Sequence, residues 1–392
     1  MQNIIFLGLV SFFSDISAEM VYPLIPLYLT SVFGATPALV GVIEGIAESV
    51  ASLLKVFSGY VTDKYQNKKP VAFLGYATGL IYKVALLIAS SWAGILVARV
   101  IDRVGKGIRT APRDALVSES ADKNSIGQAF GIHKALDMAG SSLGILIAYL
   151  LLTKAHGNFN YKGAFLISAV PAIIGLAALL FVKEQKQVRE SKPREPFWTR
   201  IKDLDNNLKL YLLVTFIFTL GNSSNTFLLL RAKSIGFTDT SAVLLYFIYS
   251  LTAALLSVFF GKLSDKIGRK KVLVSAYTTF AAVYTAFAFA SSAAMLVIAF
   301  IVYGCYAAMV AGAERALIAE VAPPELKGTM LGLHGTIVGI ALLPASIIAG
   351  FLWNAFGAVA PFAFGACLSL VAAIMLVFLL NQQQTKSLPA NE

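Results

Sequence analysis

The chain has 392 residues, of which 57% are hydrophobic and only 14% are charged, and its formal net charge is +11. This composition is too apolar for a soluble globular domain, so it predicts an integral membrane protein. Its apolar stretches are about 18 to 25 residues long, the length of a membrane-spanning helix, which excludes a barrel built from shorter, alternating strands.

We expect an all-α membrane protein with twelve transmembrane helices. They are predicted near residues 4-30, 38-61, 70-90, 92-117, 127-152, 161-182, 208-231, 239-262, 271-291, 293-319, 328-352 and 358-381. The first stretch carries Asp15 and Glu19 and no basic segment precedes it. We therefore interpret it as a retained spanning helix and not as a cleaved signal peptide.

An internal repeat with an offset of about 201 residues divides the chain. GYVTDKYQNKK at 59-69 recurs as GKLSDKIGRKK at 261-271, and PRDALVSE and GQAFGIH align with AERALIAE and GTMLGLH. The repeat predicts two six-helix halves of the same orientation, 1-182 and 208-392. The polar segment 183-207 is too charged to span a membrane and is expected to be a cytosolic linker.

Basic residues outside the predicted spans collect in alternate loops. They include Lys64, Lys68, Lys69, Lys123, Lys262, Lys266, Arg269, Lys270 and Lys271. Because basic loops stay on the cytosolic side, this pattern predicts a multi-pass protein of the cytoplasmic (inner) membrane with both termini in the cytosol. The basic excess then serves topology, and no nucleic-acid partner is expected.

Twelve helices with a parallel repeat resemble the major facilitator superfamily, and the resemblance covers essentially the whole chain. The family's loop motif G-x-L-a-D-r-x-G-r-k-x is matched at Gly261, Leu263, Asp265, Lys266, Gly268, Arg269 and Lys270. The first copy keeps Gly59, Asp63 and Lys64, whereas Gln66 and Asn67 stand where the family has Gly and Arg. The resemblance implies a gate that closes the cytosolic side in one state. A basic loop that serves topology alone is the alternative.

Three further matches are similar to the drug:proton antiporter branch. Pro23 and Pro26 in YPLIP fit its P-x-x-P element, and RVGKGIRTA places Arg103 at the branch's buried arginine. The fifth predicted span has the antiporter glycine spacing at Gly131, Gly140 and Gly144. Ile145 stands where the branch has proline. This resemblance implies proton-coupled export by alternating access between the two halves.

The fourth predicted span has seven ionisable groups between Arg99 and Asp114. Each such group costs about 2.5–3.5 kcal/mol at the centre of a bilayer, so the segment is expected to line a polar path inside the protein. The candidate proton-coupling residues are Asp15, Glu19, Glu44 and Glu48. Each pair four residues apart shares a helix face, and two like carboxylates on one face suit a group that must load and release a proton. The alternative is that these carboxylates only form ion pairs with arginines of the fourth span.

The candidate substrate-binding residues are the ionisable groups of the first half and the amide and phenol groups of the second. They are Arg99, Asp102, Arg103, Lys106, His133, Lys134, Asp137, Asn222, Asn225 and Tyr246. The candidate gating residues are Gly59, Asp63, Lys64, Arg113, Asp114, Gly261, Asp265, Arg269, Glu314 and Arg315. A surface ion-pair role is the alternative for those near 113 and 314. Arg231 is expected to extend toward the membrane surface.

The functional hypothesis is a secondary active transporter that couples proton movement to export of a small anionic or zwitterionic amphiphile. Basic groups outnumber acids across predicted spans 3 to 5, and an arginine fork binds carboxylate or phosphate well. A proton-coupled importer of an organic anion is one alternative. A divalent metal exporter is another, because His133 and Asp137 together with Asp15 and Glu19 offer imidazole and carboxylate ligands.

Enzyme activity is not expected, because H-E-x-x-H and G-x-x-x-x-G-K-[ST] are absent from the sequence. The expected partners are a small-molecule substrate, protons and the lipid bilayer. No cofactor and no resident metal are expected, and the chain is predicted to be a monomer.

Overall fold

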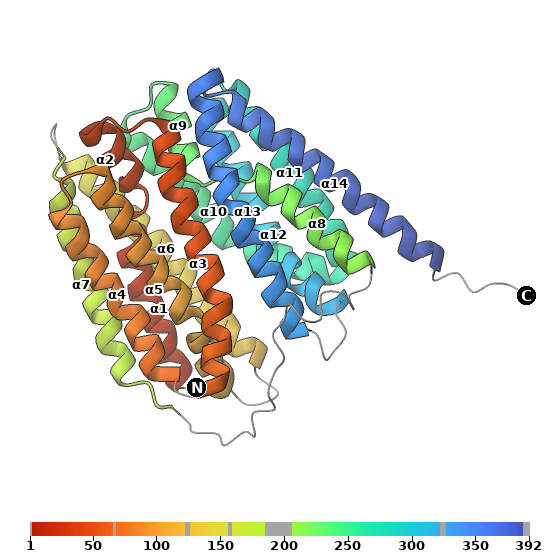
Figure 1. Cartoon of the computed structure of the whole chain (residues 1–392), viewed down its shortest axis with the longest axis horizontal. Coiled ribbons are helices and arrows are strands. Elements are labelled where there is room, and N and C mark those ends of the chain that lie inside the picture. Colours follow the sequence, from red (N-terminus) through yellow and green to blue (C-terminus); the bar gives the residue numbers. More distant parts are fainter. Residues whose placement is uncertain are drawn as a thin grey trace, which may run out of the picture.

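The computed structural model describes residues 2–65, 68–121, 126–155, 159–184, 206–321 and 327–386. Within these ranges the chain forms fourteen helices and no strand (Figure 1). The helices are α1 (Gln2–Val21), α2 (Leu24–Phe33), α3 (Pro37–Tyr65), α4 (Lys68–Ile88), α5 (Trp92–Glu119), α6 (Ile126–Lys154), α7 (Tyr161–Leu180), α8 (Asn206–Gly221), α9 (Thr226–Ser234), α10 (Asp239–Ile267), α11 (Arg269–Phe289), α12 (Ala293–Val321), α13 (Lys327–Phe356) and α14 (Ala360–Lys386).

Twelve helical segments span the bundle. Eleven of them in the described ranges are long and apolar enough to cross a membrane. The remaining one is α5, a 28-residue helix that packs against α3 and α4. Its charges lower its hydropathy, and its neighbours shield those charges from lipid. The prediction of an all-α membrane protein with twelve transmembrane helices is confirmed.

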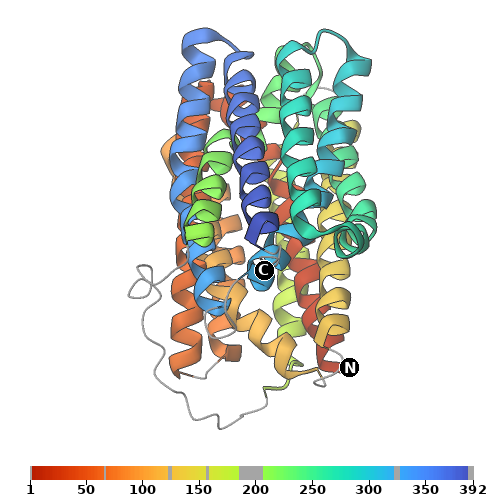
Figure 2. The same ribbon diagram turned by 90° about the vertical axis from the view of Figure 1, so that its right-hand side faces the viewer.

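The two six-helix halves have the same internal packing. Helix α1 packs on α6 and α7, and α8 packs on α13 and α14 in the same way. Likewise α5 packs on α3 and α4, while α12 packs on α10 and α11. Figure 2 shows the helices running along one common direction. The sequence repeat is therefore a structural repeat.

Two ends of the bundle can be distinguished. We call the end that holds residues 184 and 206 and the α10–α11 connection the linker end. The opposite end, formed by the connections 34–36, 89–91, 235–238 and 290–292, is called the far end. The sequence analysis predicts that the linker end is cytosolic. Residues 185–205, most of the predicted linker, lie outside the described residues.

The first and seventh spans are each broken into two helices. The first break lies at Tyr22 and Pro23, where proline provides no backbone N–H and kinks the predicted helix. The second break, between Gly221 and Thr226, contains no proline and was not predicted. There the Ser224 Oγ accepts from the Thr226 N–H at 3.3 Å, so a side chain replaces a helical backbone bond. The two breaks occupy equivalent positions of the repeat.

Helices α3 and α13 join the halves through small residues. A Cβ atom on Gly339 would lie 2.7 Å from the Ser52 Cβ, and one on Gly45 would lie 2.9 Å from the Leu343 carbonyl oxygen. Glycine at these positions allows the two backbones to approach, as in other close helix pairs in membranes.

Polar bonds also join the halves at the far end. The Tyr161 hydroxyl donates to Asp239 at 3.1 Å, and Lys233 donates to the Ser31 hydroxyl at 3.3 Å. Lys233 also forms an ion pair with Asp239 at 2.8 Å. Asp239 therefore ties a helix of each half together at the far end.

Replacing Asp239 by Asn is expected to shift the population toward structures open at the far end. The change weakens the Tyr161 bond, which crosses between the halves, and it releases Lys233 within the C-terminal half; the effect is about 0.5–1 kcal/mol, or a two- to five-fold change in population. Spin labels on cysteines placed at Lys162 and Thr240, in a variant without the two native cysteines, measure the distance across this end.

The matched control is Lys154→Gln, which removes an exposed far-end charge for which no bond is described. Distance distributions that are the same for Asp239→Asn and the control contradict a latch at Asp239.

Arg231 is buried rather than extended toward the membrane surface. Its guanidinium donates to the carbonyl oxygens of Phe287, Ala288 and Ala290 at 2.8, 2.9 and 3.3 Å. These carbonyls end α11 and have no intrahelical partner, so a positive charge near them is favourable. The expectation of a snorkelling side chain was wrong, because the break before α9 turns this residue toward α11.

Arg231→Lys is expected to destabilise the protein by about 2–3 kcal/mol, since one ammonium group cannot replace the guanidinium at all three carbonyls. Thermal unfolding of the purified protein in detergent measures the loss. Lys154→Ala, a change at an exposed position of the other half, should leave the transition unchanged. Equal transitions for Arg231→Lys and the native chain rule out the capping role.

Candidate transport site

The strongest ion pair of the described residues lies inside the N-terminal half. Arg99 on α5 donates from Nε and Nη2 to the two carboxylate oxygens of Glu44 on α3, at 2.9 and 2.7 Å. Both side chains are at most 2% exposed. A planar fork that meets a carboxylate in this way satisfies both charges, so the pair can exist away from water.

One helical turn further along α5 and α3, Arg103 and Glu48 form a second ion pair that is more exposed to solvent. Their closest atoms are 2.9 Å apart, and the Glu48 side chain is 26% exposed. Asp102 lies beside both arginines, with closest distances of 3.7 Å to Arg99 and 3.8 Å to Arg103. The two ion pairs lie one above the other because Arg99 and Arg103 on α5, and Glu44 and Glu48 on α3, are each four residues apart.

Asp15 and Asp137 bring two carboxyl groups together from α1 and α6. Their side chains are close enough to hydrogen-bond to each other. Asp137 also accepts from the Ser11 hydroxyl at 3.0 Å and from Lys134 at 2.6 Å. Two carboxyl groups can share a hydrogen bond only when one of them carries a proton. This pair is thus a natural site for a single proton.

Glu19 and Lys106 face the same region without a tight bond. No hydrogen bond or ion pair of either side chain is found among the described residues, although the two charges lie within electrostatic range. Lys106 is exposed, and Glu19 is partly exposed. They are charged groups on the two helices α5 and α1 that remain available to a ligand.

Tyr22, at the break of the first span, connects the arginines to the other half. Its ring lies under the guanidinium groups of Arg99 and Arg103, at 5.2 and 5.7 Å. On its other side it stacks on Tyr246 of α10 at 5.9 Å. The sequence analysis did not single out Tyr22. Its position directly before the kinking proline was the available signal.

The C-terminal half presents a wall of phenols and amides. Asn225 donates to the Tyr249 hydroxyl at 3.3 Å and accepts from the Tyr303 hydroxyl at 2.7 Å. Asn222 donates to the Tyr306 hydroxyl at 3.2 Å. Among the predicted substrate-binding residues, Asn222, Asn225 and Tyr246 therefore lie on one aromatic surface. This surface is mostly apolar and carries a few hydrogen-bonding groups in fixed positions, which is typical of small-molecule binding sites.

Helices α2 and α9 both begin at the breaks and run to the far end. Their N-termini therefore lie inside the span, at the breaks. Neither N-cap residue, Pro23 or Asn225, forms a side-chain cap bond. The N-terminus of a helix carries about half a positive charge and favours anions, and broken helices are used in this way in other transporters.

Two predicted binding residues are turned into the first half rather than toward the second. His133 is buried, and its Nε2 has no hydrogen-bond partner among the described residues. Lys134 is exposed on its outer side but holds Asp137, as above. Lys83, also buried, donates to the Ser17 carbonyl oxygen at 3.0 Å. It fastens α4 to the first span.

The predicted gating residues lie toward the linker end. Arg113 pairs with its neighbour Asp114 at 2.8 Å, and Asp265 lies 3.5 Å from Arg269. Glu314 lies 3.3 Å from the ring nitrogen Nε2 of His334. The remaining predicted gating residues are Gly261, where a Cβ atom would meet open space, and Gly59, Asp63, Lys64 and Arg315, whose side chains lie outside the described part of the chain. The gate stays a prediction.

Comparison with known families decides the class of protein. The model of the Major Facilitator Superfamily matches residues 7–229 and again 210–392, one match per half. The chain belongs to the major facilitator superfamily. It is therefore a multi-pass membrane transporter, and the resemblance seen in the loop motif is confirmed at the level of the superfamily.

Relatives in this superfamily agree with that assignment. An uncharacterized MFS-type transporter of Methanocaldococcus jannaschii is 38% identical over 387 residues, which are 96% of this chain and 95% of the relative. The fosmidomycin resistance protein of Escherichia coli is 27% identical over 270 residues, 66% of this chain and 64% of that protein. A structure of a point mutant of the nucleoside transporter NupG superimposes with a TM-score of 0.81 at 14% identity, covering 96% of this chain and 99% of that one, and shares its fold.

Proposed function

We propose that this superfamily member is a proton-coupled transporter of small organic anions, with export as its direction. The observation that carries the proposal is the group of basic side chains on α5, Arg99, Arg103 and Lys106, of which the two arginines lie over Tyr22 at the break before α2. The Asp15–Asp137 carboxyl pair lies in the same half. A ligand between the halves would meet the exposed Lys106, beside the ion-paired Arg99 and Arg103, on one side and the tyrosine wall on the other, which suits an amphiphilic anion.

The balance of charged side chains in the first half supports coupling between proton binding and anion binding. The central part of the first half has six basic and six acidic side chains: Lys83, Arg99, Arg103, Lys106, Arg109 and Lys134 against Asp15, Glu19, Glu44, Glu48, Asp102 and Asp137. One proton shared by the Asp15–Asp137 pair leaves the cluster with one net positive charge. An anion that binds beside it restores neutrality in a region of low dielectric constant.

Two observations bear on direction. A relative named for fosmidomycin resistance, together with the P-x-x-P element at Pro23 and Pro26, supports export in exchange for protons. The charge balance instead favours a proton and an anion bound at the same time, which makes inward co-transport the second candidate. Metal export has less support, because no group of three or more His, Cys, Asp or Glu side chains suited to a metal occurs in the described ranges.

Proteoliposomes with an imposed pH gradient test the proposal. Matched anionic, neutral and cationic amphiphiles are offered outside, and uptake is measured with the lumen acidic or alkaline. Uptake of the anion driven by an acidic lumen is expected for the exporter, whereas uptake driven by an alkaline lumen identifies co-transport. Preference for the cation, or flux indifferent to both gradients, overturns the proposal.

A further inference from the structure

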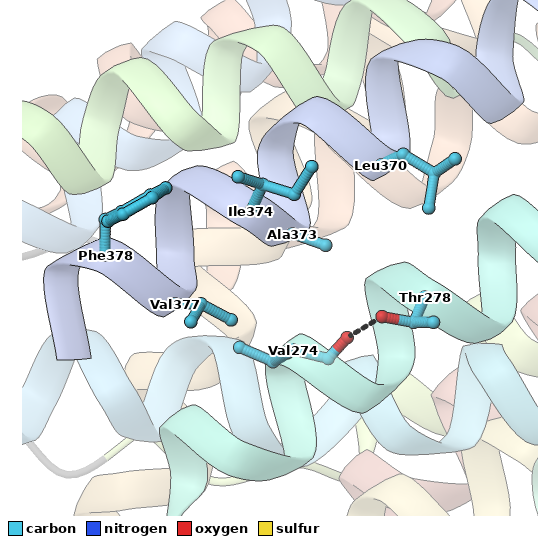
Figure 3. Close-up of a pocket in the computed structure, with 7 residues that line it drawn as sticks. All are labelled: Val274, Thr278, Leu370, Ala373, Ile374, Val377 and Phe378. Carbon is cyan, nitrogen blue, oxygen red and sulfur yellow. Dashed lines mark hydrogen bonds between the residues drawn. The ribbon is translucent and has the colours of Figure 1, made fainter. Parts of the chain in front are cut away.

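A groove on the outer surface of the C-terminal half lies between α11 and α14, away from the transport site (Figure 3). Its volume is about 300 Å³, and its walls are Val274, Thr278, Leu370, Ala373, Ile374, Val377 and Phe378. The Ile374 and Phe378 side chains are 55% and 64% exposed. The groove therefore opens outward, where the bilayer surrounds the bundle.

The residues that line the groove favour an apolar ligand. Thr278 supplies the polar side chain of the lining, and its hydroxyl already donates to the Val274 carbonyl oxygen at 2.9 Å, as Figure 3 shows. The other lining side chains are all hydrocarbon. An acyl chain can fill such a groove without leaving a polar group unpaired, whereas a polar ligand would lose hydrogen bonds.

One end of the groove is basic. Helix α11 begins with Arg269, Lys270 and Lys271, and Lys271 is exposed. Because Lys271, Val274 and Thr278 are spaced three and four residues apart, they share one face of α11. The preceding residue, Gly268, has no side chain to cap the first turn. Positive side chains and the N-terminus of α11 thus lie at the same end of the helix as the groove's Val274.

The equivalent position of the N-terminal half is different. In the alignment of 59-69 with 261-271 the offset is 202 residues, so Ala72 stands in place of Val274, and it is buried in an apolar cluster. Lys69, at the start of α4, donates to the Leu180 carbonyl oxygen of α7 at 2.9 Å. There the equivalent position is covered by neighbouring residues, and the lysine is bonded to the neighbouring helix. The groove with its basic end is a property of the C-terminal half.

We propose that this groove is a binding site for an anionic phospholipid of the leaflet that faces the linker end. One acyl chain lies between Val274 and Phe378, and the phosphate-bearing headgroup meets Lys271 at the start of α11. The helices α11 and α14 run in opposite directions, so Phe378 of α14 lies near the start of α11. The acyl chain therefore extends along α14 from Phe378 toward Leu370. The charge of the basic end selects an anionic headgroup over a zwitterionic one.

Native mass spectrometry of the full-length transporter tests this site. The protein is equilibrated in detergent with equal amounts of phosphatidylglycerol and phosphatidylcholine that have the same chains. The native chain is expected to retain phosphatidylglycerol preferentially, and Lys271→Gln should weaken that retention about five-fold, the effect of one basic residue near an anionic lipid. Thr278→Phe fills the groove and should remove the preference, and Ile374→Trp, at an exposed lining position, is a second groove-filling variant.

The matched control is Lys262→Gln, which removes an exposed lysine near the end of α10, at the same end of the bundle. Equal retention of the two lipids by the native chain overturns the proposal. So does equal weakening by Lys271→Gln and Lys262→Gln, because a general charge effect would then explain it. Displacement of the lipid by soluble glycerol phosphate alone would show that the headgroup binds without the groove and would overturn the acyl-chain part.

Discussion

Replacing Glu44 by Gln is expected to destabilise the protein by about 3–5 kcal/mol, the usual cost of leaving one charge of a buried pair without its partner. Arg99 would keep its positive charge among side chains that exclude water, and the 3.7 Å contact with Asp102 cannot replace a bidentate carboxylate. Thermal unfolding in detergent, together with the yield of folded protein, measures this loss.

Two variants make the prediction specific. Glu44→Gln combined with Arg99→Gln removes both charges and should recover most of the stability. Glu48→Gln is the matched control on the same helix, and its loss should be clearly smaller, because the Glu48 side chain is 26% exposed and water screens the charge left on Arg103. If Glu44→Gln unfolds at the same temperature as the native chain, the pair does not hold the half together.

The second large effect is expected at the carboxyl pair. Asp15→Asn should abolish transport driven by a pH gradient while leaving substrate exchange in the absence of a gradient. An amide in place of Asp15 can still donate a hydrogen bond to Asp137 but cannot bind or release a proton. Asp137→Asn should have the same effect on coupling and should also free Lys134. Flux in proteoliposomes with and without a gradient separates the two activities.

Glu119→Gln is the control, because it neutralises a carboxylate of the same half whose partner, Lys68, lies at the linker end. Gradient-driven flux that survives in both Asp15→Asn and Asp137→Asn places proton coupling elsewhere. Glu19, which has no tight bond among the described side chains, is then the next residue to neutralise, before the ion-paired Glu44 and Glu48.

The fold could be predicted from the sequence because it depends on local properties that the sequence displays directly. Runs of apolar residues define the spans, and the repeat defines the halves. The kink at Pro23 also follows from local chemistry. The break at Gly221–Thr226 was harder, since a short polar run inside a span is equally compatible with a continuous helix whose side chains face a cavity.

The site could be predicted only in part. Its charged residues were recognised because ionisable groups in a span are costly and therefore rarely incidental. Their partners depend on how helices cross, which no spacing within one helix reveals. Asp15 was grouped with Glu19 on α1, yet its close neighbour is Asp137 of α6. Asp239 was missed because an acidic residue at a helix end is common and carries no signal alone, whereas Tyr22 could have been noticed from its position directly before Pro23.

The distribution of the strong bonds has a consequence for the energy of the transport cycle. Arg99–Glu44 and Arg103–Glu48 lie wholly within the N-terminal half, so a rocking motion carries them along intact. The described polar contacts that cross between the halves are single hydrogen bonds, such as the 3.1 Å bond from Tyr161 to Asp239 and the 3.4 Å approach of the Ser224 hydroxyl to Glu44. The two end states of the cycle can then differ by only a small free energy. In such a balanced system the arrival of one proton or one ligand suffices to decide which state is populated.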